Sequence, residues 1–310
     1  MKILLTAGLG SPFPRLAEDL KKLGYKVVLA DSAADKEFTS WKKDSPTVMY
    51  KPRLLGKGYY VDIQKILDIE NPDYYVPMLD EEIIWAHSLK GVKILSPTKH
   101  FCAACLNKED LMQYLRDLKI SVVKTWVGDG PNKYPIKYPC FIKPIVGRGS
   151  RGARRLENKN EYLAHLVMEG KQPWQMMRQE YLDGDEYTVS VVVNKKNQLM
   201  ALVPKLVYEK RGITIHAVTE KNGGIYGVCK DVVRKMNPCG TFNVQLKVVD
   251  GIPKIFEINP RLSTTSILTT AAGVNEIDLM IKHWEDDSPP YVDFKEGVHM
   301  RRRWESVIYE

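Results

Sequence analysis

The stretch KIFEINPRLSTTSILTTAAG, residues 254–273, joins an apolar strand to an unusual set of polar side chains. Its first five residues are mostly apolar and include β-branched side chains, which favour strands. Glu257 and Asn259 are two residues apart, so both side chains point to the same face of the pleat. With Arg261 two positions further on, the pattern predicts a sheet edge that gathers a carboxylate, an amide oxygen and a guanidinium.

The same strand forms the second arm of a predicted β-hairpin. NVQLKVV and KIFEIN flank Asp250-Gly251, a dipeptide typical of tight hairpin turns. Antiparallel pairing around this turn brings Gln245 beside Glu257 and Asn259. One carboxylate and two amide oxygens suit a hard cation such as Mg²⁺, with nucleotide phosphates as its remaining ligands. The alternative is an exposed strand face that carries polar residues.

The composition is that of a globular protein with an excess of positive charge. The chain has 310 residues, of which 44% are hydrophobic, and its formal net charge is +8. No apolar run approaches the roughly 20 residues needed to span a bilayer. The start, MKILLTAGLG, is interpreted as a first strand rather than a signal peptide. We therefore expect a cytoplasmic protein with no membrane partner.

The cysteines indicate neither a disulfide framework nor a metal centre. Their odd count of five, without an export signal, argues for reduced thiols. Cys102 and Cys105 form a lone CxxC, whereas a zinc site needs a second pair or a nearby histidine at ligand spacing. We interpret the two cysteines as small residues near the start of a helix.

Positive charge is spread along the chain and accompanies no recognised nucleic-acid motif. The densest basic run, Arg301–Arg303, is interpreted as part of a solvated C-terminal strand. The excess charge also suits anionic small molecules. We therefore expect nucleotides and carboxylates as partners, and no nucleic acid.

Residues 1–97 alternate between predicted strands and predicted helices. The strands are KILLTAG, YKVVLAD, YYVPML and VKILSP, and such alternation predicts an α/β region with a parallel sheet. Gly8-Leu9-Gly10 begins a dinucleotide fingerprint, but Phe13 stands where the third glycine is required. A nicotinamide cofactor is therefore not expected. From residue 98 onward, two helices and then short strands separated by turns predict an α+β region.

Three carboxylates directly follow the strand YYVPML. Asp80, Glu81 and Glu82 lie at the carboxyl end of a predicted parallel strand, where open α/β sheets bind ligands. We expect part of a substrate to be recognised there. The alternative is helix capping and interaction with the helix dipole, because the same residues open a predicted helix.

A lysine and a glycine-rich loop follow each other in PCFIKPIVGRGSRG. Lys143 ends an apolar strand, where an inward-pointing lysine needs an anionic partner. Gly147, Gly149 and Gly152 come next, and glycine loops let backbone N–H groups approach phosphates closely. The spacing is not that of a P-loop. Taken alone, the glycines fit a hairpin turn equally well, but the neighbouring lysine weakens that alternative.

A third segment, RQEYLDGDEYTVSVVV, combines apolar and acidic residues around a turn. Glu180, Tyr181 and Leu182 precede the turn, and Glu186 begins a new strand. An adenine needs an apolar slot edged by backbone donors and acceptors, and a carboxylate six residues on can bind ribose hydroxyls. Taken alone, the segment is an acidic turn.

Five segments in this order resemble the ATP-grasp superfamily. They are NKEDL, FIKPIVGRGSRG, QEYLDGDEYTV, NVQLKVV and FEINPRLSTTS. The set is most similar to a single synthetase unit of the carbamoyl-phosphate synthetase large subunit, and FEINPR after NVQ is its most specific part. The resemblance implies a Rossmann-like pre-ATP-grasp domain over residues 1–97 and an ATP-grasp domain over residues 98–310. Within the latter it implies a small lobe at about 125–185 and a large lobe with the metal site at about 186–310.

The resemblance also implies roles for individual residues. Lys108 and Lys143 would hold the α- and β-phosphates, and Arg261 would face the transferred phosphoryl group, so that Lys143 and Arg261 would be the catalytic residues. Gln245, Glu257 and Asn259 would bind Mg²⁺, with Mn²⁺ as a substitute. Gln245 stands where many ATP-grasp ligases have a carboxylate. Nucleotide contacts would come from Lys108, Lys143, Gly147, Arg148, Gly149, Ser150, Gly152, Glu180, Tyr181, Leu182 and Glu186.

The activity that the resemblance implies is ATP-dependent joining of a carboxylate and an amine through an acyl phosphate. The substrates would be small molecules, and a homodimer is compatible with the resemblance. Two alternatives stay open: a small-molecule kinase on the same fold, and a nucleotide-binding regulatory module without chemistry. The retained lysines, glutamate, asparagine and arginine argue against the second of these.

Overall fold

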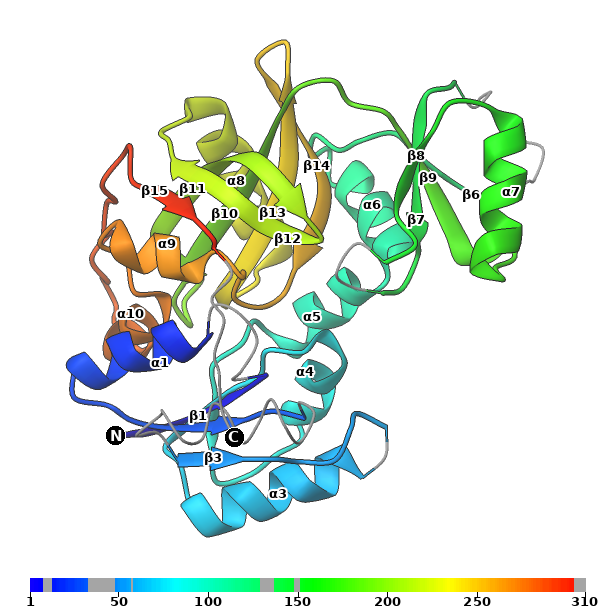
Figure 1. Ribbon diagram of the computed structural model, residues 1–310. Coiled ribbons are helices and arrows are strands. Elements are labelled where there is room, and N and C mark those ends of the chain that lie inside the picture. The colour runs from blue at the N-terminus through cyan, green and yellow to red at the C-terminus, as the bar shows by residue number, and fades with distance from the viewer. Residues whose placement is uncertain (8–12, 33–47, 57, 129–136, 148–150, 304–310) are drawn as a thin grey trace.

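The structure is a computed structural model that describes residues 1–7, 13–32, 48–56, 58–128, 137–147 and 151–303. Within these residues the strands form three sheets, each built from one part of the chain. Figure 1 shows the parallel N-terminal sheet beneath a large antiparallel sheet, with a smaller sheet standing to one side.

The N-terminal sheet has the strand order β3-β2-β1-β4-β5, and all of its neighbouring strands are parallel. The prediction of a parallel α/β region is therefore confirmed. Apolar residues of α1 cover one face of this sheet, and those of α3 and α4 cover the other. The elements are β1 (Lys2–Thr6), α1 (Phe13–Lys22), β2 (Lys26–Ala30), β3 (Val48–Tyr50), α3 (Tyr59–Glu70), β4 (Tyr74–Val76), α4 (Asp80–Ala86) and β5 (Lys93–Ile94).

Two short helices, α5 (Lys99–Leu106) and α6 (Lys108–Asp117), lead out of the N-terminal sheet, as the sequence predicts. Each begins at a side chain that satisfies free backbone N–H groups. Thr98 accepts from the N–H of Phe101, and Asn107 accepts from the first turn of α6. Cys102 and Cys105 are buried in α5, and burial raises the pKa of both thiols. The two cysteines therefore pack as small core residues.

The small lobe is an antiparallel sheet with the order β6-β9-β7-β8, covered by a helix. Its core includes Ile142 and Leu156 from the sheet and Tyr162 and Leu166 from the helix. Its elements are β6 (Thr125–Val127), β7 (Cys140–Pro144), β8 (Arg154–Leu156), α7 (Lys159–Glu169), the 3₁₀ turn Pro173–Gln175 and β9 (Met176–Glu180).

The large sheet is antiparallel throughout, with the order β14-β13-β10-β11-β12-β15. Its strands are β10 (Asp185–Val193), β11 (Leu199–Arg211), β12 (Ile213–Thr219), β13 (Gly240–Val249), β14 (Ile252–Asn259) and β15 (His299–Arg301). The helices α8 (Gly223–Met236), α9 (Ser266–Ala271) and α10 (Glu276–His283) pack on it, and α5 and α6 contact its edge strand β14.

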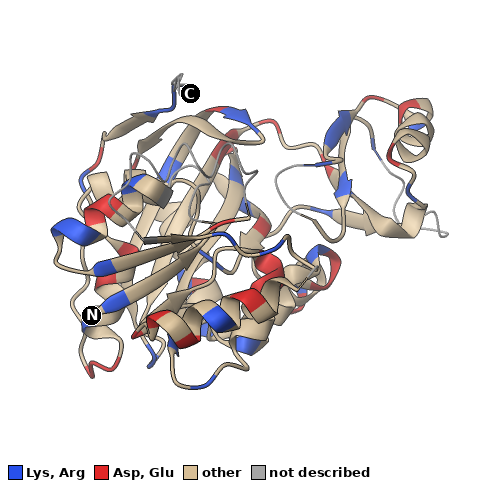
Figure 2. Cartoon of the chain, turned by 60° about the horizontal axis from the view of Figure 1, so that its bottom comes forward, with Lys and Arg blue, Asp and Glu red and all other residues tan. Residues whose placement is uncertain are grey.

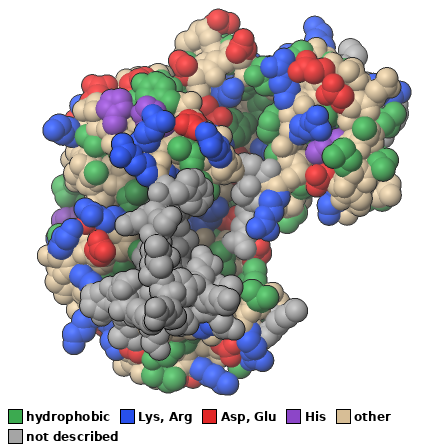
Figure 3. Space-filling view, viewed as in Figure 1, with side chains coloured by type: hydrophobic (Ala, Val, Ile, Leu, Met, Phe, Trp, Pro, Cys, Tyr) green, Lys and Arg blue, Asp and Glu red, His purple; other side chains and the backbone are tan. Residues whose placement is uncertain are grey.

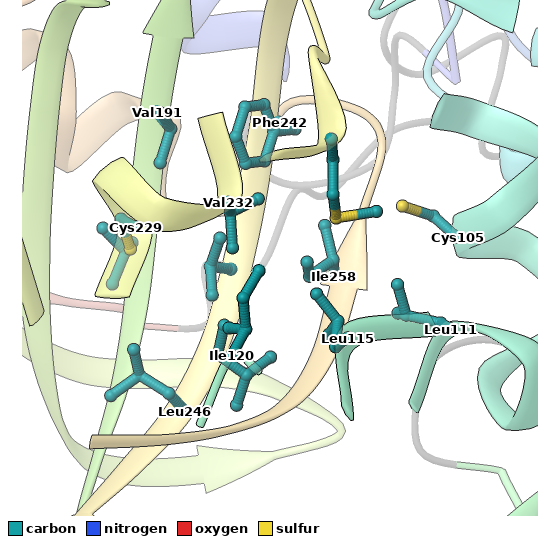
Figure 4. Packing of buried hydrophobic residues seen from close by; sticks show 14 of the residues in the cluster. Cys105, Leu111, Leu115, Ile120, Val191, Cys229, Val232, Phe242, Leu246 and Ile258 are labelled. Atoms are coloured by element: carbon teal, nitrogen blue, oxygen red, sulfur yellow. The ribbon is translucent and has the colours of Figure 1, made fainter. Parts of the chain in front are cut away.

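One face of the large sheet is apolar and forms a core with α5, α6 and α8. Figure 4 shows Phe242 and Leu246 of β13 and Ile258 of β14 packed against Val232 of α8 and Leu115 of α6. The opposite face is polar where it lines the cavity described below. It is apolar where α10 and the N-terminal sheet cover it.

The N-terminal sheet and the large sheet share a hydrophobic core. Ile3 and Leu5 of β1 belong to the same buried cluster as Val192 of β10, Met200 of β11 and Met280 of α10. This shared core holds the two sheets together and so positions the cleft between them. We keep the proposed domain boundary after residue 97, because the chain there passes from the parallel sheet into α5.

The predicted hairpin is confirmed as β13 and β14. Asp250 and Gly251 have φ angles of 50° and 77°, and positive φ at both central residues is what a tight hairpin turn of this kind requires.

In the described part of the chain, no helix combines the length and apolar character needed to cross a membrane. Figure 2 shows lysine and arginine distributed over all three sheets, interspersed with acidic residues.

Candidate active site

A cavity of about 870 Å³ lies among the three sheets and contains most of the predicted site residues. Figure 3 shows the hollow that separates the small lobe, at the upper right, from the rest of the molecule. The predicted residues that line it are Lys108, Lys143, Gly147, Glu180, Tyr181, Leu182, Glu186, Gln245, Glu257, Asn259 and Arg261. Gly152 is not among the lining residues, although Arg151 and Ala153 are. Arg148, Gly149 and Ser150 lie outside the described residues.

The hairpin places its oxygen ligands side by side. Gln245 is directly opposite Glu257 in the β13–β14 register, and Asn243 is opposite Asn259. Asn243 is buried, lines the cavity and accepts a hydrogen bond of 2.6 Å from the hydroxyl of Thr188. Asn243 was not predicted as a site residue, although its position two residues before Gln245 places it on the same strand face.

Lys143 forms an ion pair with the predicted metal ligand Glu257. Its Nζ lies 3.2 Å from Glu257 Oε2 and donates to the carbonyl of Phe256 at 2.9 Å. Burial lowers the pKa of Lys143, the Glu257 carboxylate opposes that shift, and the nearby Lys108 and Lys210 reinforce it. The buried lysine therefore has the anionic partner that the sequence required.

The pKa of Glu257 is set by two opposing effects. Burial raises it, but Lys143, Lys108 and Lys210 together lower it by more, so its pKa lies below the ordinary value. The carboxylate is therefore charged at neutral pH. Two carboxylates, Glu257 and the Lys210 partner Glu186, face the three ammonium groups, so three minus two leaves one excess positive charge, which an anionic ligand can balance. We call the part of the cavity around Lys108, Lys143 and Lys210 the lysine side.

The other two lysines of the lysine side also have specific partners. Lys108 Nζ donates to the carbonyl of Gly147 at 2.5 Å, so it contacts the start of the glycine loop. Lys210 Nζ lies 2.7 Å from Glu186 Oε1 and 5.8 Å from the centre of the Phe256 ring. Lys210 was not predicted as a site residue, because LVYEKRG matches no motif and only the fold of β11 brings this lysine to the cavity.

The segment from Glu180 to Leu182 forms the wall between the small lobe and the large sheet. Glu180 Oε1 accepts from the backbone N–H of Lys124 at 3.1 Å and from Lys254 Nζ at 3.2 Å. The Tyr181 ring packs against the guanidinium of Arg155, whose Cζ lies 4.2 Å from its centre. The Glu180 side chain is thus held by protein groups, which leaves the aromatic and apolar surfaces of the next two residues to the cavity.

A second group of lining residues is neutral and carries hydroxyl groups. Thr214, Ser263 and Thr264 line the cavity, and we call the part around them the hydroxyl side. It adjoins the lysine side, because Thr214 is directly opposite Lys210 in the β11–β12 register. Ala7, Met78, Leu79 and Ile213 also line the cavity and add apolar surface.

Arg302 binds the backbone of the hydroxyl side. Its Nε donates to the carbonyl of Thr214 at 2.7 Å, and its Nη2 donates to the carbonyl of Thr264. Burial lowers the pKa of Arg302, which is half-buried. The interpretation of Arg301–Arg303 as a solvated run is therefore wrong for its middle residue, which tethers β12 to the segment after β14.

Of the three carboxylates that follow β4, Glu82 fits the capping alternative rather than contact with a substrate. Glu82 is fully buried, and its carboxylate accepts from the N–H groups of Met78 and Leu79 at 2.7 and 3.0 Å. It also accepts from the hydroxyls of Tyr59 and Thr6. These contacts are those of the capping alternative, in which the carboxylate ties down the segment before α4.

The fit of a metal ion rests on mixed oxygen donors. Among the described residues, no three His, Cys, Asp or Glu side chains come together to hold a metal. The predicted set instead offers the carboxylate of Glu257 with the amide groups of Gln245 and Asn259, which converge on one face of the hairpin. Such a set fits Mg²⁺ when nucleotide phosphates supply the remaining oxygens.

Comparisons with known proteins agree with this geometry. Residues 172–305 match a family model described as "ATP-grasp in the biosynthetic pathway with Ter operon". A D-alanine–D-alanine ligase of Petrotoga mobilis is 29% identical over 169 residues, which are 47% of this chain and 56% of the ligase. The arginine-specific carbamoyl phosphate synthase large chain of Geobacillus stearothermophilus is 24% identical over 200 residues, or 59% of this chain and 19% of that protein.

Solved structures show the same fold over nearly the whole chain. Biotin carboxylase of Campylobacter jejuni superposes with a TM-score of 0.73 at 16% identity, covering 96% of this chain and 74% of that one. An L-amino acid ligase of Bacillus licheniformis gives a TM-score of 0.68 at 15% identity, covering 91% and 73%.

The family model and the relatives show that the chain is similar to ATP-grasp proteins, and the solved structures show the same fold, so the resemblance stated from its five segments is confirmed. The similarity to carbamoyl-phosphate synthetases is confirmed as well. The chain spans about half the length of the D-alanine–D-alanine ligase that it matches and about a fifth of the carbamoyl phosphate synthase.

Proposed function

We propose that the protein is an ATP-dependent carboxylate–amine ligase that forms an amide or peptide bond through an acyl phosphate. The observation that carries this proposal is the lysine side of the cavity. There Lys108, Lys143 and Lys210 surround Glu257, and Arg261 lines the same cavity. Fixed cations beside a carboxylate and amide oxygens suit a nucleoside triphosphate with its metal ion.

The lysines hold the phosphates of ATP in this proposal. Lys143 and Lys108 bind the α- and β-phosphates, and Lys210 extends the positive charge along the chain of phosphates. Tyr181 and Leu182 receive the adenine, and Glu186 receives the ribose hydroxyls. Because Glu186 is paired with Lys210, nucleotide binding would connect the ribose contact to the phosphate contact.

Gln245, Glu257 and Asn259 would hold Mg²⁺, with Asn243 beside them, and Mn²⁺ fits the same oxygen donors. When bound, the cation neutralises phosphate charge that develops during transfer. Lys143 is the counter-ion of Glu257 in the protein, so this carboxylate is kept ionised for the metal.

The chemistry needs positioning and charge neutralisation by this chain, and no side-chain nucleophile. An oxygen of the substrate carboxylate attacks the γ-phosphorus, the bond to the β,γ-bridging oxygen breaks, and ADP leaves. The amine nitrogen then attacks the acyl carbon, the bond to the phosphate oxygen breaks, and the nitrogen loses a proton. Arg261 stabilises the transferred phosphoryl group and the departing phosphate.

The substrates are proposed to be small molecules, one carboxylate and one amine. D-alanine–D-alanine ligase and L-amino acid ligase, both similar to this chain, are named for joining such groups. Carboxylases share the fold at lower identity, so the fold alone does not select the reaction. A cytoplasmic location, where ATP is supplied, completes the proposal.

The test is ADP release from ATP and Mg²⁺ in the presence of pooled amino acids, with product identified by mass. A ligase releases ADP at full rate only when both a carboxylate and an amine are present. Lys143→Met should abolish that rate, and Lys195→Met, which removes an exposed lysine of the large lobe, should leave it unchanged. ADP release that needs no amine and yields a phosphorylated product would contradict the ligase and support a kinase.

A further inference from the structure

An ion pair connects the N-terminal sheet to the cavity. Arg261 Nε donates to Asp80 Oδ1 at 2.6 Å, and the two side chains are only 17% and 16% exposed. Arg261 follows β14 of the large sheet, whereas Asp80 is the first residue of α4. Contact between residues 181 positions apart therefore spans the two proposed domains.

The backbone that leads into Asp80 is held by hydrogen bonds to Glu82. Met78 and Leu79 donate their backbone N–H groups to the buried carboxylate of Glu82, which the Tyr59 hydroxyl also contacts at 2.5 Å. The chain therefore enters α4 along a fixed path. Because the backbone position of Asp80 is fixed, its short side chain can place its carboxylate oxygens in few positions.

The ion pair leaves part of the guanidinium for the cavity. An arginine has five N–H donors in a planar fork. Nε is used by Asp80 and one Nη1 donor by the carbonyl of Leu262 at 3.2 Å. Because Arg261 lines the cavity, the remaining Nη donors can face a ligand there. Fixing Nε fixes the plane of the fork, and thereby the direction of the remaining donors.

We propose that Asp80 is a positioning residue, which holds Arg261 so that the Nη donors that have no partner among the described residues face the terminal phosphoryl group of the nucleotide. This rests on the proposed function, which places the γ-phosphate at Arg261. Asp80 itself contacts neither nucleotide nor substrate. The N-terminal domain thus contributes to recognition of the transferable phosphate through a residue of the large lobe.

The test is the affinity for ATP compared with ADP, because it needs no knowledge of the substrates. Isothermal titration with Mg²⁺ gives both dissociation constants for the wild type, Asp80→Ala, Arg261→Ala and the double variant. Asp80→Ala should weaken ATP binding about 10-fold and leave ADP binding unchanged, because a charge-assisted contact to the γ-phosphate is lost. Arg261→Ala should do at least as much, and adding Asp80→Ala to it should change nothing further.

Two further variants separate positioning from general stability. Asp80→Glu should recover part of the preference for ATP, since it restores a carboxylate. Asp62→Ala is the matched control. Asp62 also lies in the first turn of a helix of the N-terminal sheet region, and it also pairs with an arginine, Arg53, at 2.9 Å, but neither residue lines the cavity. It should leave both affinities unchanged. Should Asp80→Ala fail to fold, Asp80→Asn gives the same comparison.

The outcomes distinguish this inference from the function on which it rests. If Arg261→Ala reduces the preference for ATP and Asp80→Ala does not, the positioning role is wrong and the proposed function stands. If Asp80→Ala still weakens ATP binding in the Arg261→Ala protein, Asp80 acts by another route and the inference is overturned. If the wild type binds neither nucleotide, the proposed function fails and the inference fails with it.

Discussion

The lysine side and the hydroxyl side of the cavity are built in different ways. On the lysine side, each cation has a protein partner, as in the pairs Lys143–Glu257 and Lys210–Glu186. On the hydroxyl side, Thr214, Ser263 and Thr264 present neutral groups from separate segments, which Arg302 ties together through backbone carbonyls.

The difference indicates how the two sides select their ligands. Fixed charge recognises any ligand with the right phosphates, so the lysine side suits a nucleotide that many enzymes share. Neutral hydroxyls and apolar surface select by shape and by individual hydrogen bonds, each of which contributes only about 0.5–1.5 kcal/mol. We therefore expect substitutions on the lysine side to affect turnover of every substrate, and those on the hydroxyl side to affect only the choice of substrate.

The largest expected effect is at Glu257. Glu257→Gln keeps the size of the side chain but removes the charge that pairs with Lys143 and would bind the metal. We expect ADP release to fall about 100- to 1000-fold, by analogy with the loss of one preorganised electrostatic contact. The measurement is steady-state ADP release at saturating ATP, with thermal unfolding as the check that the fold is intact. Near wild-type activity at ordinary Mg²⁺ concentration would disprove the metal assignment.

A smaller effect is expected at Lys205, a lysine that is not among the described lining of the cavity. Lys205 is fully buried, and its Nζ donates to the hydroxyls of Ser190 and Thr269 at 2.7 and 2.8 Å. Burial lowers its pKa to about 8, an effect that Glu276 opposes. The folded protein therefore binds fewer protons than the unfolded chain between pH 8 and the ordinary lysine pKa of 10.5.

This shift predicts how the stability of the protein depends on pH. Below pH 8 the folded state carries the full cost of a buried ammonium, and that cost disappears as pH rises toward 10.5. Relative to Lys205→Met, the wild type should gain about 2 kcal/mol of unfolding free energy between pH 7 and pH 10. Urea denaturation of both proteins at the two pH values measures this gain. A constant difference would mean that Lys205 keeps an ordinary pKa.

The smallest effect is expected on the hydroxyl side. Thr264→Val removes one hydroxyl while keeping the shape of the side chain, so it should raise the KM for one substrate about 3- to 10-fold. The KM for ATP should not change, because the lysine side is intact. Initial rates with each component varied in turn test this. An increase in the KM for ATP instead would show that the two sides do not act separately, and would remove the basis of the comparison.

Much of the fold was predictable because its signals are local. The alternation of strands and helices in residues 1–97 and the Asp250-Gly251 hairpin each depend on neighbouring residues, and both are present in the structure. The same holds for Glu257 and Asn259, whose shared face follows from strand geometry. The roles assigned to the site residues stay predictions, although the structure brings most of these residues to one cavity.

The errors and omissions have a common physical cause. Glu82 lies two residues after Asp80 in the sequence and is also acidic, yet Glu82 is buried in a capping network and Asp80 pairs with Arg261. Local sequence cannot separate them, because the direction of each side chain depends on how α4 packs on the sheet. Lys210 and Arg302 were assigned no role for the same reason, since their partners lie on other strands.

The order of residues along the chain was enough to specify the strands, the hairpin turn and the chemical types gathered on β14, because these depend on pleat geometry and on turn preferences over a few residues. Tertiary structure decided which charges meet. It brought Lys143 to Glu257, Lys210 to Glu186 and Asp80 to Arg261 across separations of 24 to 181 residues. Such contacts depend on the packing of one sheet against another, which long-range burial of apolar surface determines and no local pattern encodes.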